Sequence, residues 1–234
     1  MYHKNKQKEE YERFLTTRPL WANFEKGMYG IPVMWKPTLT IEKASYADIL
    51  NYRNLSAKAP LSNTIISNFA FDSSLETVWR NPFSYLPRLR ESLAVTTPDF
   101  SITPAMNEAQ IINNTFRNRW MGCFWQQNYI DAIPTVSWAE KWTYSICIQG
   151  ITKGSPFAVS TIGVSDIAMF LDGYLFFLNQ IQPPFIICYG KPIPGMTGEI
   201  IAFDYSEAFM PAKIGQQERL FIPSRLIDDK KEEN

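Results

Sequence analysis

Polar side chains that follow short apolar runs are the residues best placed for chemistry. Three such runs, at 94–97, 132–136 and 156–159, are followed by small polar or aromatic residues: Asp99 and Ser101, Ser137 and Trp138, Ser160 and Thr161. Ligands of α/β proteins bind where the carboxyl ends of parallel strands meet, so we expect these six residues to lie near one rim. The alternative for each hydroxyl is a helix cap, because serine and threonine also favour that position.

Asp99 is the strongest single candidate for a catalytic residue. It stands between Pro98 and Phe100 at the end of a short apolar run. A carboxylate there can act as a general acid or base, or anchor a ligand. Its alternative role is structural, as an acceptor for loop amides. Asp72 and Glu140 could approach it in space, but no neighbouring carboxylate signals a paired-carboxylate hydrolase.

Arg117 and Arg119 are the candidate contacts for an anion. They lie on a helix predicted over 104–127, which has a side rich in amides and poor in charge. Residues two apart differ by roughly 200° around a helix. One arginine could therefore bind a phosphate or carboxylate, while the other would form a structural ion pair.

Composition excludes several classes of function. Lysine plus arginine and aspartate plus glutamate both total 23, which argues against a general polyanion binder and makes nucleic acid the less favoured partner. The single histidine, His3, lies in a charged segment, so we expect no histidine base and no metal site. No Walker loop or dinucleotide glycine pattern is present, and the sequence identifies no cofactor.

The elements that must position these residues alternate along the chain. Strands are predicted over 38–41, 64–71, 94–97, 132–137, 156–160, 185–189 and 199–205, and helices over 46–53, 75–81, 104–127, 138–148 and 166–180. Asp72 or Ser73 should cap the helix at 75, and Ser165 the last one. Continuous apolar strands between helices indicate an α/β fold with a mainly parallel sheet. A small or incomplete barrel and a doubly wound sheet both remain open.

The chain divides into three parts on composition. Residues 1–18 form a charged N-terminal segment, 19–227 a single α/β domain and 228–234 a disordered tail. Within the domain, the aromatic stretch 19–37 should lie over the core as an irregular segment. Dispersed Cys123, Cys147 and Cys188, with neither a secretory signal nor a run long enough to span a bilayer, predict a cytoplasmic protein without membrane contact.

Several motifs resemble one family. They are Trp79-Arg80-Asn81-Pro82 with Tyr85-Leu86, Pro98-Asp99-Phe100-Ser101, Asn118-Arg119-Trp120-Met121-Gly122, Ile133-Pro134-Thr135-Val136-Ser137-Trp138 and Ala158-Val159-Ser160-Thr161-Ile162-Gly163. In this order, over roughly 69–189, they look like domain of unknown function 4417, a family of bacteria, phages and other mobile elements. The resemblance implies a phage or mobile-element protein in the cytoplasm of a bacterial host. It implies no activity, and residues 1–60 and the loop after Tyr189 fall outside it.

Two functions remain in competition. The first is a strand-end pocket for a small anionic or nucleotide-like ligand, with or without catalysis. Asp99 would be its acid, base or anchor, Arg117 or Arg119 its anion contact, and Ser101, Ser137, Ser160, Thr161 and Trp138 its remaining wall. The second is a non-enzymatic interaction protein that inhibits a host nucleic-acid or defence enzyme through the aromatic stretch 19–37.

Overall fold

The computed structural model describes residues 2–55, 60–204 and 220–222 of the 234. Its strands are β1 (Asp48–Asn51), β2 (Thr64–Ser67), β3 (Ala94–Thr96), β4 (Ala132–Ile133), β5 (Phe157–Ser160), β6 (Ile186–Tyr189), β7 (Ile200–Phe203) and β8 (Leu220–Ile222). Its α-helices are α1 (Tyr2–Thr17), α2 (Ile41–Tyr46), α3 (Asp72–Arg80), α4 (Leu86–Leu89), α5 (Glu108–Gln126), α6 (Tyr144–Cys147) and α7 (Ile167–Ile181). Short 3₁₀ turns cover Met28–Gly30, Tyr52–Asn54 and Lys141–Thr143.

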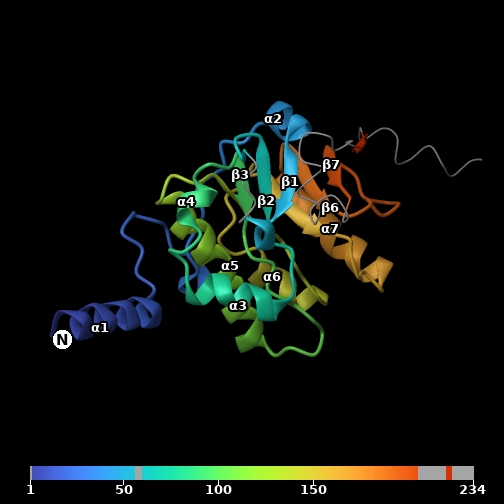
Figure 1. The fold of residues 1–234 in the computed structure, drawn as a ribbon. Helices are drawn as coiled ribbons and strands as arrows, with labels where there is room; N and C mark the ends of the chain where they lie inside the picture. Colours follow the sequence, from blue (N-terminus) through green and yellow to red (C-terminus); the bar gives the residue numbers. More distant parts are fainter. Residues whose placement is uncertain (1, 56–59, 205–219, 223–234) are drawn as a thin grey trace, which may run out of the picture.

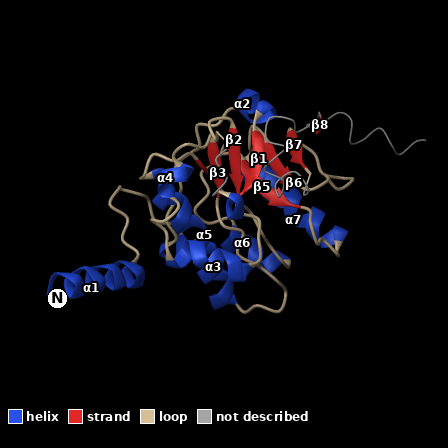
Figure 2. Cartoon of the chain, in the orientation of Figure 1, coloured by secondary structure: helices blue, strands red, loops and turns tan. Residues whose placement is uncertain are grey.

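The strands form two parallel sheets that meet at one point (Figures 1 and 2). One has the order β1-β2-β3-β4, and the other β5-β6-β7 with β8 added antiparallel. A parallel bridge between Thr135 and Ala158 joins them, with the Val136 amide donating to the Ala158 carbonyl at 2.9 Å. Within each sheet, strands that lie side by side are thus also consecutive along the chain. In a doubly wound sheet the order of the strands reverses at one point. Here the strands follow one another as in a barrel, but the described strands do not close into a full one.

The strands bury both faces, which explains their continuous apolar sequences. On one face β1–β4 pack against α3, α4 and α5, and β5–β7 pack against α6 and α7. The other face forms a single cluster with a residue from each of β1 to β7: Ile49, Ile65, Ala94, Ile133, Ala158, Ile187 and Ile201. Across this inner face the rings of Phe69 and Tyr189 stack with centroids 5.1 Å apart. The sheet therefore curves far enough for its two ends to share a core.

Two predictions near the start of the domain are wrong. Residues 46–53, predicted as a helix, contain β1, and 38–41, predicted as a strand, leads into α2. Thr40 caps α2 by accepting a hydrogen bond from the Lys43 amide at 3.4 Å. Burial on both faces explains why residues 48–51 form the strand β1. Ile49 packs in the cluster on the inner face of the sheet, while Leu50 packs against the helices on its outer face. That alternation depends on the tertiary structure, which overrides weak local propensity.

The predicted helix starts differ from the observed ones. Helix α3 begins at Asp72 and has no side-chain cap, because the N-cap residue is Phe71; the Asp72 carboxylate accepts the Ser101 amide at 3.0 Å. Asp166, not Ser165, caps α7 by accepting the Met169 amide at 2.9 Å. Helix α5 begins later than predicted, after Asn107, whose side chain forms a capping box with Gln110.

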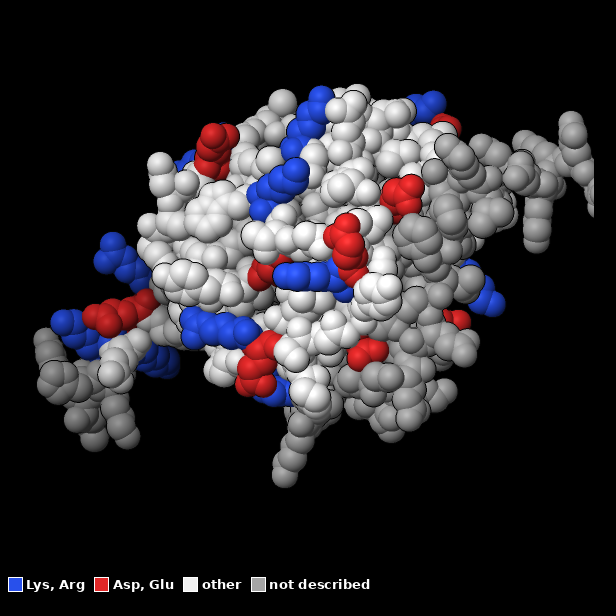
Figure 3. All heavy atoms as spheres, turned by 90° about the horizontal axis from the view of Figure 1, so that it is seen from above, with Lys and Arg blue, Asp and Glu red and all other residues white. Residues whose placement is uncertain are grey.

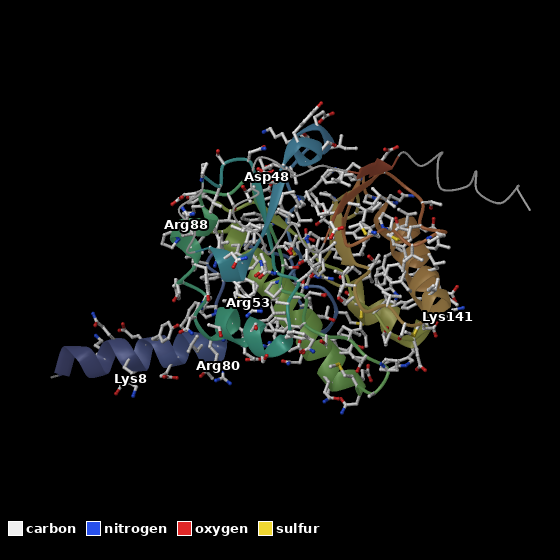
Figure 4. The ribbon with its side chains drawn as sticks, turned by 45° about the vertical axis from the view of Figure 1, so that its right-hand side comes forward. Lys8, Asp48, Arg53, Arg80, Arg88 and Lys141 are labelled. Carbon is white, nitrogen blue, oxygen red and sulfur yellow. The ribbon has the colours of Figure 1, made fainter. Side chains whose placement is uncertain are left out.

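The N-terminal part of the chain wraps the helical side of the molecule. Helix α1 projects from one side of the molecule with its N-terminal end outward and Lys8 exposed, while Phe14 near its other end packs against Phe83 and Trp120 (Figures 1 and 4). The stretch 19–37 contains a short 3₁₀ turn and one isolated bridge between Lys26 and Pro32, yet Phe24, Ile31 and Met34 in it are buried. The predicted irregular segment over the core is therefore present. The predicted tail 228–234 lies outside the described residues.

Charges on the surface are mixed. Seen from the α2 side, Lys and Arg alternate with Asp and Glu over a largely uncharged surface (Figure 3). One exposed pair joins Lys141 to Asp172 on α7 at 3.3 Å (Figure 4). Among the helices of the described ranges, none combines the length and apolar character needed to cross a bilayer.

Candidate strand-end pocket

A pocket of about 340 Å³ lies where the ends of β4 and β5 meet the start of α7. Its walls come from three segments: the turn after β3, the chain after β4, and the loop from β5 into α7. The polar residues that line it are Asp99, Thr103, Ser137, Ser160, Ser165 and Asp166. The apolar ones include Ile102, Trp138, Met169 and Phe170. The volume is that of a small-molecule site.

Asp99 is held in this pocket by its own backbone. Its amide donates to the Asn68 carbonyl at 3.2 Å. The preceding residue, Pro98, accepts a hydrogen bond at 2.8 Å from the side-chain amide of Asn118 on α5. Because β2 and α5 both fix this turn, the carboxylate has a defined direction, as a group that recognises a ligand requires.

The carboxyl group of Asp99 is poised to change its protonation near neutral pH. Burial opposes the charged form and raises the pKa of Asp99 to about 6; the hydrogen bond from Ser137 lowers this pKa, and the nearby Asp72 carboxylate raises it. Of the two acids that the sequence offered as neighbours, Asp72 therefore acts on Asp99. A carboxyl with this pKa can donate or accept a proton at physiological pH.

The serines after β4 and β5 complete the polar wall. The Ser137 hydroxyl donates a hydrogen bond to Asp99 Oδ1. The Ser160 hydroxyl is 3.3 Å from the Tyr189 carbonyl and accepts the Ile162 amide at 3.2 Å. Asp99, Ser137 and Ser160 thus come from three successive strand ends and line one cavity.

Trp138 forms the apolar wall and connects it to α7. Its ring packs against Phe170 and Phe177, with centroids 5.2 and 5.1 Å away. Helix α7 approaches so closely that a Cβ at Gly173 would overlap the indole. Little of Trp138 is accessible, since the residue is 9% exposed. It therefore bounds the pocket without offering an open stacking face.

A buried polar network supports the pocket from behind. Arg119 is fully enclosed and donates to the carbonyls of Thr135, Cys147 and Gln149 at 2.8, 2.8 and 2.9 Å. Its remaining contact is the side-chain oxygen of Asn118. Burial lowers the pKa of Arg119 to about 10, and it stays charged at neutral pH. These bonds hold α5 against the chain that carries Ser137.

Three further candidates from the sequence do not line the pocket. Arg117 pairs with Glu76, and its guanidinium lies 3.7 Å from the Phe100 ring centroid. Ser101 donates to Asp72 through its amide and hydroxyl, at 3.0 and 3.1 Å. Thr161 faces the Tyr189 carbonyl, which accepts its amide at 3.0 Å. Arg117 and Arg119 thus make contacts within the protein on opposite sides of α5, as helix geometry requires for residues two apart.

The charge of the pocket differs from the sequence-based expectation. Asp99 and Asp166 contribute carboxylates, and among the residues that the structure describes no lysine or arginine lines the cavity. Such a pocket disfavours an anion. Sequence reasoning missed Asp166 and Thr103. The usable signal for Asp166 was its position directly before an apolar helix, which is that of a helix cap.

The three cysteines of the chain are buried and protonated. Cys123, Cys147 and Cys188 are free and buried, and burial raises the pKa of all three thiols, that of Cys147 to about 11. They are neutral at physiological pH. Within the described ranges, no three or more histidine, cysteine, aspartate or glutamate side chains gather as metal ligands.

Comparison with known proteins places these features in a family. The family model described as "Domain of unknown function (DUF4417)" matches residues 25–206. The "Gene 1 protein" of Mycobacterium phage D29 is 36% identical over 137 residues, which cover 57% of this chain and 51% of that protein. The "Gene 1 protein" of Mycobacterium phage L5 is 35% identical over 127 residues, covering 53% and 56%. The chain spans about half the length of these curated relatives.

Proposed function

The chain belongs to the DUF4417 family, which is phage-associated, and from that premise we propose that its strand-end pocket binds a small hydrogen-bonding molecule without negative charge. The observation that carries the proposal is the convergence of Asp99, Ser137 and Ser160 in one cavity of about 340 Å³. Asp99 is the anchor and the proton-exchanging group. The protein would act inside the bacterial host.

The class of ligand follows from the charges and hydrogen-bonding groups of the pocket. The described lining holds the carboxylates of Asp99 and Asp166 and no cation, so a phosphate group would meet repulsion there. An uncharged or cationic molecule that donates to Asp99 and contacts the serine hydroxyls fits better. A nucleoside is one such molecule and keeps the nucleotide-like character proposed from the sequence, without its phosphate.

Binding should depend on pH through Asp99. Because its pKa is about 6, Asp99 accepts a charge-assisted hydrogen bond from the ligand above that pH and only a weaker, neutral one below it. Affinity should therefore rise as the pH increases from 5 to 7. The Asp99→Asn variant should bind more weakly and with a flat pH profile.

Mass spectrometry of small molecules that copurify with the protein tests the proposal. The wild type and Ser101→Ala, which lies outside the pocket, should carry the same compound, and Asp99→Asn and Ser160→Ala should lose it. Nucleosides and their 5′-monophosphates should then be compared by thermal shift on the wild type and Asp99→Asn, where the stabilisation that this substitution removes should be that by the uncharged nucleosides. Equal retention by wild type and both pocket variants would rule the pocket out as the binding site.

A second function, an interaction protein that blocks a host enzyme, is favoured by one observation. The stretch 19–37 exposes four large apolar side chains: Trp21 (61%), Met28 (53%), Tyr29 (49%) and Trp35 (46%). Aromatic residues and methionine are enriched in protein interfaces. Deletion of the stretch would remove Phe24, Ile31 and Met34 from the core, so surface substitutions are the appropriate test.

Trp21→Ser combined with Met28→Ser should abolish capture of a host protein while leaving the melting temperature nearly unchanged. Asp99→Asn serves as the matched pocket variant and should capture that protein normally. If the pocket variant loses capture and the surface variant retains it, the interaction through 19–37 is excluded.

A further inference from the structure

A second cavity, of about 410 Å³, lies between the end of α1, the stretch 19–32 and the outer side of α5. We call it the Arg18 pocket. Its lining includes Arg18, Asn23, Phe24, Lys26, Phe116 and Trp120. It shares no residue with the strand-end pocket. Its charge is also opposite, since two cations line it and, among the described residues, no carboxylate does.

Arg18 reaches this position through an unfavourable backbone conformation. It directly follows α1 with φ at +47°, in the left-handed region that glycine normally occupies at a helix end. Its amide closes the helix by donating to the Phe14 carbonyl at 2.8 Å. The turn lays the guanidinium on the Trp79 ring, 3.7 Å from the centroid. A strained arginine in place of glycine indicates that the side chain itself is needed here.

The guanidinium of Arg18 has donors without acceptors. Nε and Nη1 are buried and have no hydrogen-bond partner in the part of the chain that the structure describes. Nearly all buried polar groups in folded proteins are paired, so each such donor calls for an explanation. Burial lowers the pKa of Arg18 to about 10, which still leaves the group charged at neutral pH.

The neighbourhood of Arg18 has an excess of positive charge. Arg117 shares the Trp79 indole, 5.2 Å from its centroid, and its Nε also lacks a partner. Besides the Tyr11 phenol, the acidic group that raises the pKa of Arg18 is Glu76, which is already bonded to Arg117 and lies 3.7 Å from Arg80. Figure 4 shows Arg80 on α3 beside α1. Three arginines thus share one carboxylate.

We propose that the Arg18 pocket binds the phosphate group of a small phosphorylated molecule, with Arg18 and Lys26 as its cationic contacts. Because Nε and Nη1 are enclosed, Arg18 would contact the phosphate through its charge and its third nitrogen, Nη2, and exposed Lys26 adds a point charge at the rim. Phe24 and Phe116 form an apolar wall for the remainder of the ligand. This site is independent of the strand-end pocket and uses the charge that the other pocket lacks.

Isothermal titration calorimetry with phenyl phosphate, inorganic phosphate and phenol tests this assignment in dilute neutral buffer. Both phosphates should bind, phenol should not, and added salt should weaken binding. Lys26→Glu, an exposed change that spares the Trp79 stack, should weaken binding about fivefold. Arg18→Met should weaken it about tenfold or more. Lys36→Glu, the same charge change outside the pocket, should leave it unchanged.

Three results would overturn the proposal. They are phenol binding as tightly as phenyl phosphate, equal losses in Lys26→Glu and Lys36→Glu, and the absence of phosphate binding by the wild type at millimolar concentration. Asp99→Asn should bind phenyl phosphate like the wild type, because the pockets share no residue. This separates failure at one pocket from failure at the other.

Discussion

Asp99 lines the strand-end pocket, and its raised pKa should also affect the stability of the protein. Its folded pKa, about 6, lies above the ordinary value of 3.8. Between these values the folded state binds more protons than the unfolded state, so stability falls as the pH rises through this window. Above pH 6 the ionised, buried carboxylate costs about 2 kcal/mol after allowance for its partial exposure.

The Asp99→Asn variant should remove this cost. We expect its free energy of unfolding to exceed that of the wild type by about 1–2 kcal/mol at pH 7.5. At pH 3.5, Asp99 of the wild type is largely protonated in both the folded and the unfolded state. The free energies of unfolding of the two proteins should then be nearly equal. Urea unfolding across this pH range measures the difference. A wild type whose stability increases from pH 4 to 6 relative to the variant would contradict the raised pKa.

Arg119 is a buried charged residue that should stabilise the fold mainly through its hydrogen bonds. It has no carboxylate within ion-pair distance among the described residues, and it satisfies the Thr135, Cys147 and Gln149 carbonyls instead. Arg119→Met leaves these acceptors unpaired, so we expect a loss of about 3 kcal/mol in thermal or urea unfolding. Arg119→Lys should not restore stability, because ammonium lacks the planar fork.

The exposed Arg80, whose side chain is 75% accessible, provides the control. Arg80→Met should cost less than about 0.5 kcal/mol, as expected for a surface ion pair. Similar losses at both positions would mean that Arg119 contributes as a charge and not through its buried bonds.

At the scale of elements, the contact between α7 and Trp138 sets one wall of the strand-end pocket. In an ordinary helix Gly→Ala stabilises by about 1 kcal/mol. At Gly173 the added methyl group would overlap the Trp138 indole, so α7 must move outward. We expect Gly173→Ala to destabilise by about 1–3 kcal/mol and to weaken ligand binding at the pocket.

Ala168, exposed on the same helix, isolates the propensity effect. Ala168→Gly should cost about 1 kcal/mol and leave binding unchanged. Thermal melts of both variants measure the two effects. A Gly173→Ala protein that is more stable than the wild type would show that α7 can move to accommodate the methyl group.

Elements with strong local signals could be predicted from the sequence, and those decided by tertiary contacts could not. The strands β2, β3, β5, β6 and β7 and the helices α5 and α7 were predicted within a few residues because apolar runs and caps mark them. By contrast, β1 is four residues long, and only its two-sided burial makes it a strand. The Asp99–Ser137 pair followed from strand-end positions, whereas the directions of Arg117 and Arg119 depended on partners distant in sequence, including Glu76 and Gln149.

At the scale of the molecule, the inner core joins the two sheets. Ile65 on β2 and Ile187 on β6 belong to the same buried cluster, although they come from different sheets. We therefore propose that 19–227 folds as one domain, as the sequence indicated. Small domains with a continuous core unfold in one cooperative step.

Ile65→Ala and Ile187→Ala test this cooperativity from the two ends of the sheet. Each should lower the free energy of unfolding by about 2–5 kcal/mol, because both side chains are fully buried. Each variant should show one transition, coincident by circular dichroism and tryptophan fluorescence. A variant in which one half melts while the other keeps its transition would divide the chain at the Thr135–Ala158 bridge, which joins the two sheets in the described part of the chain.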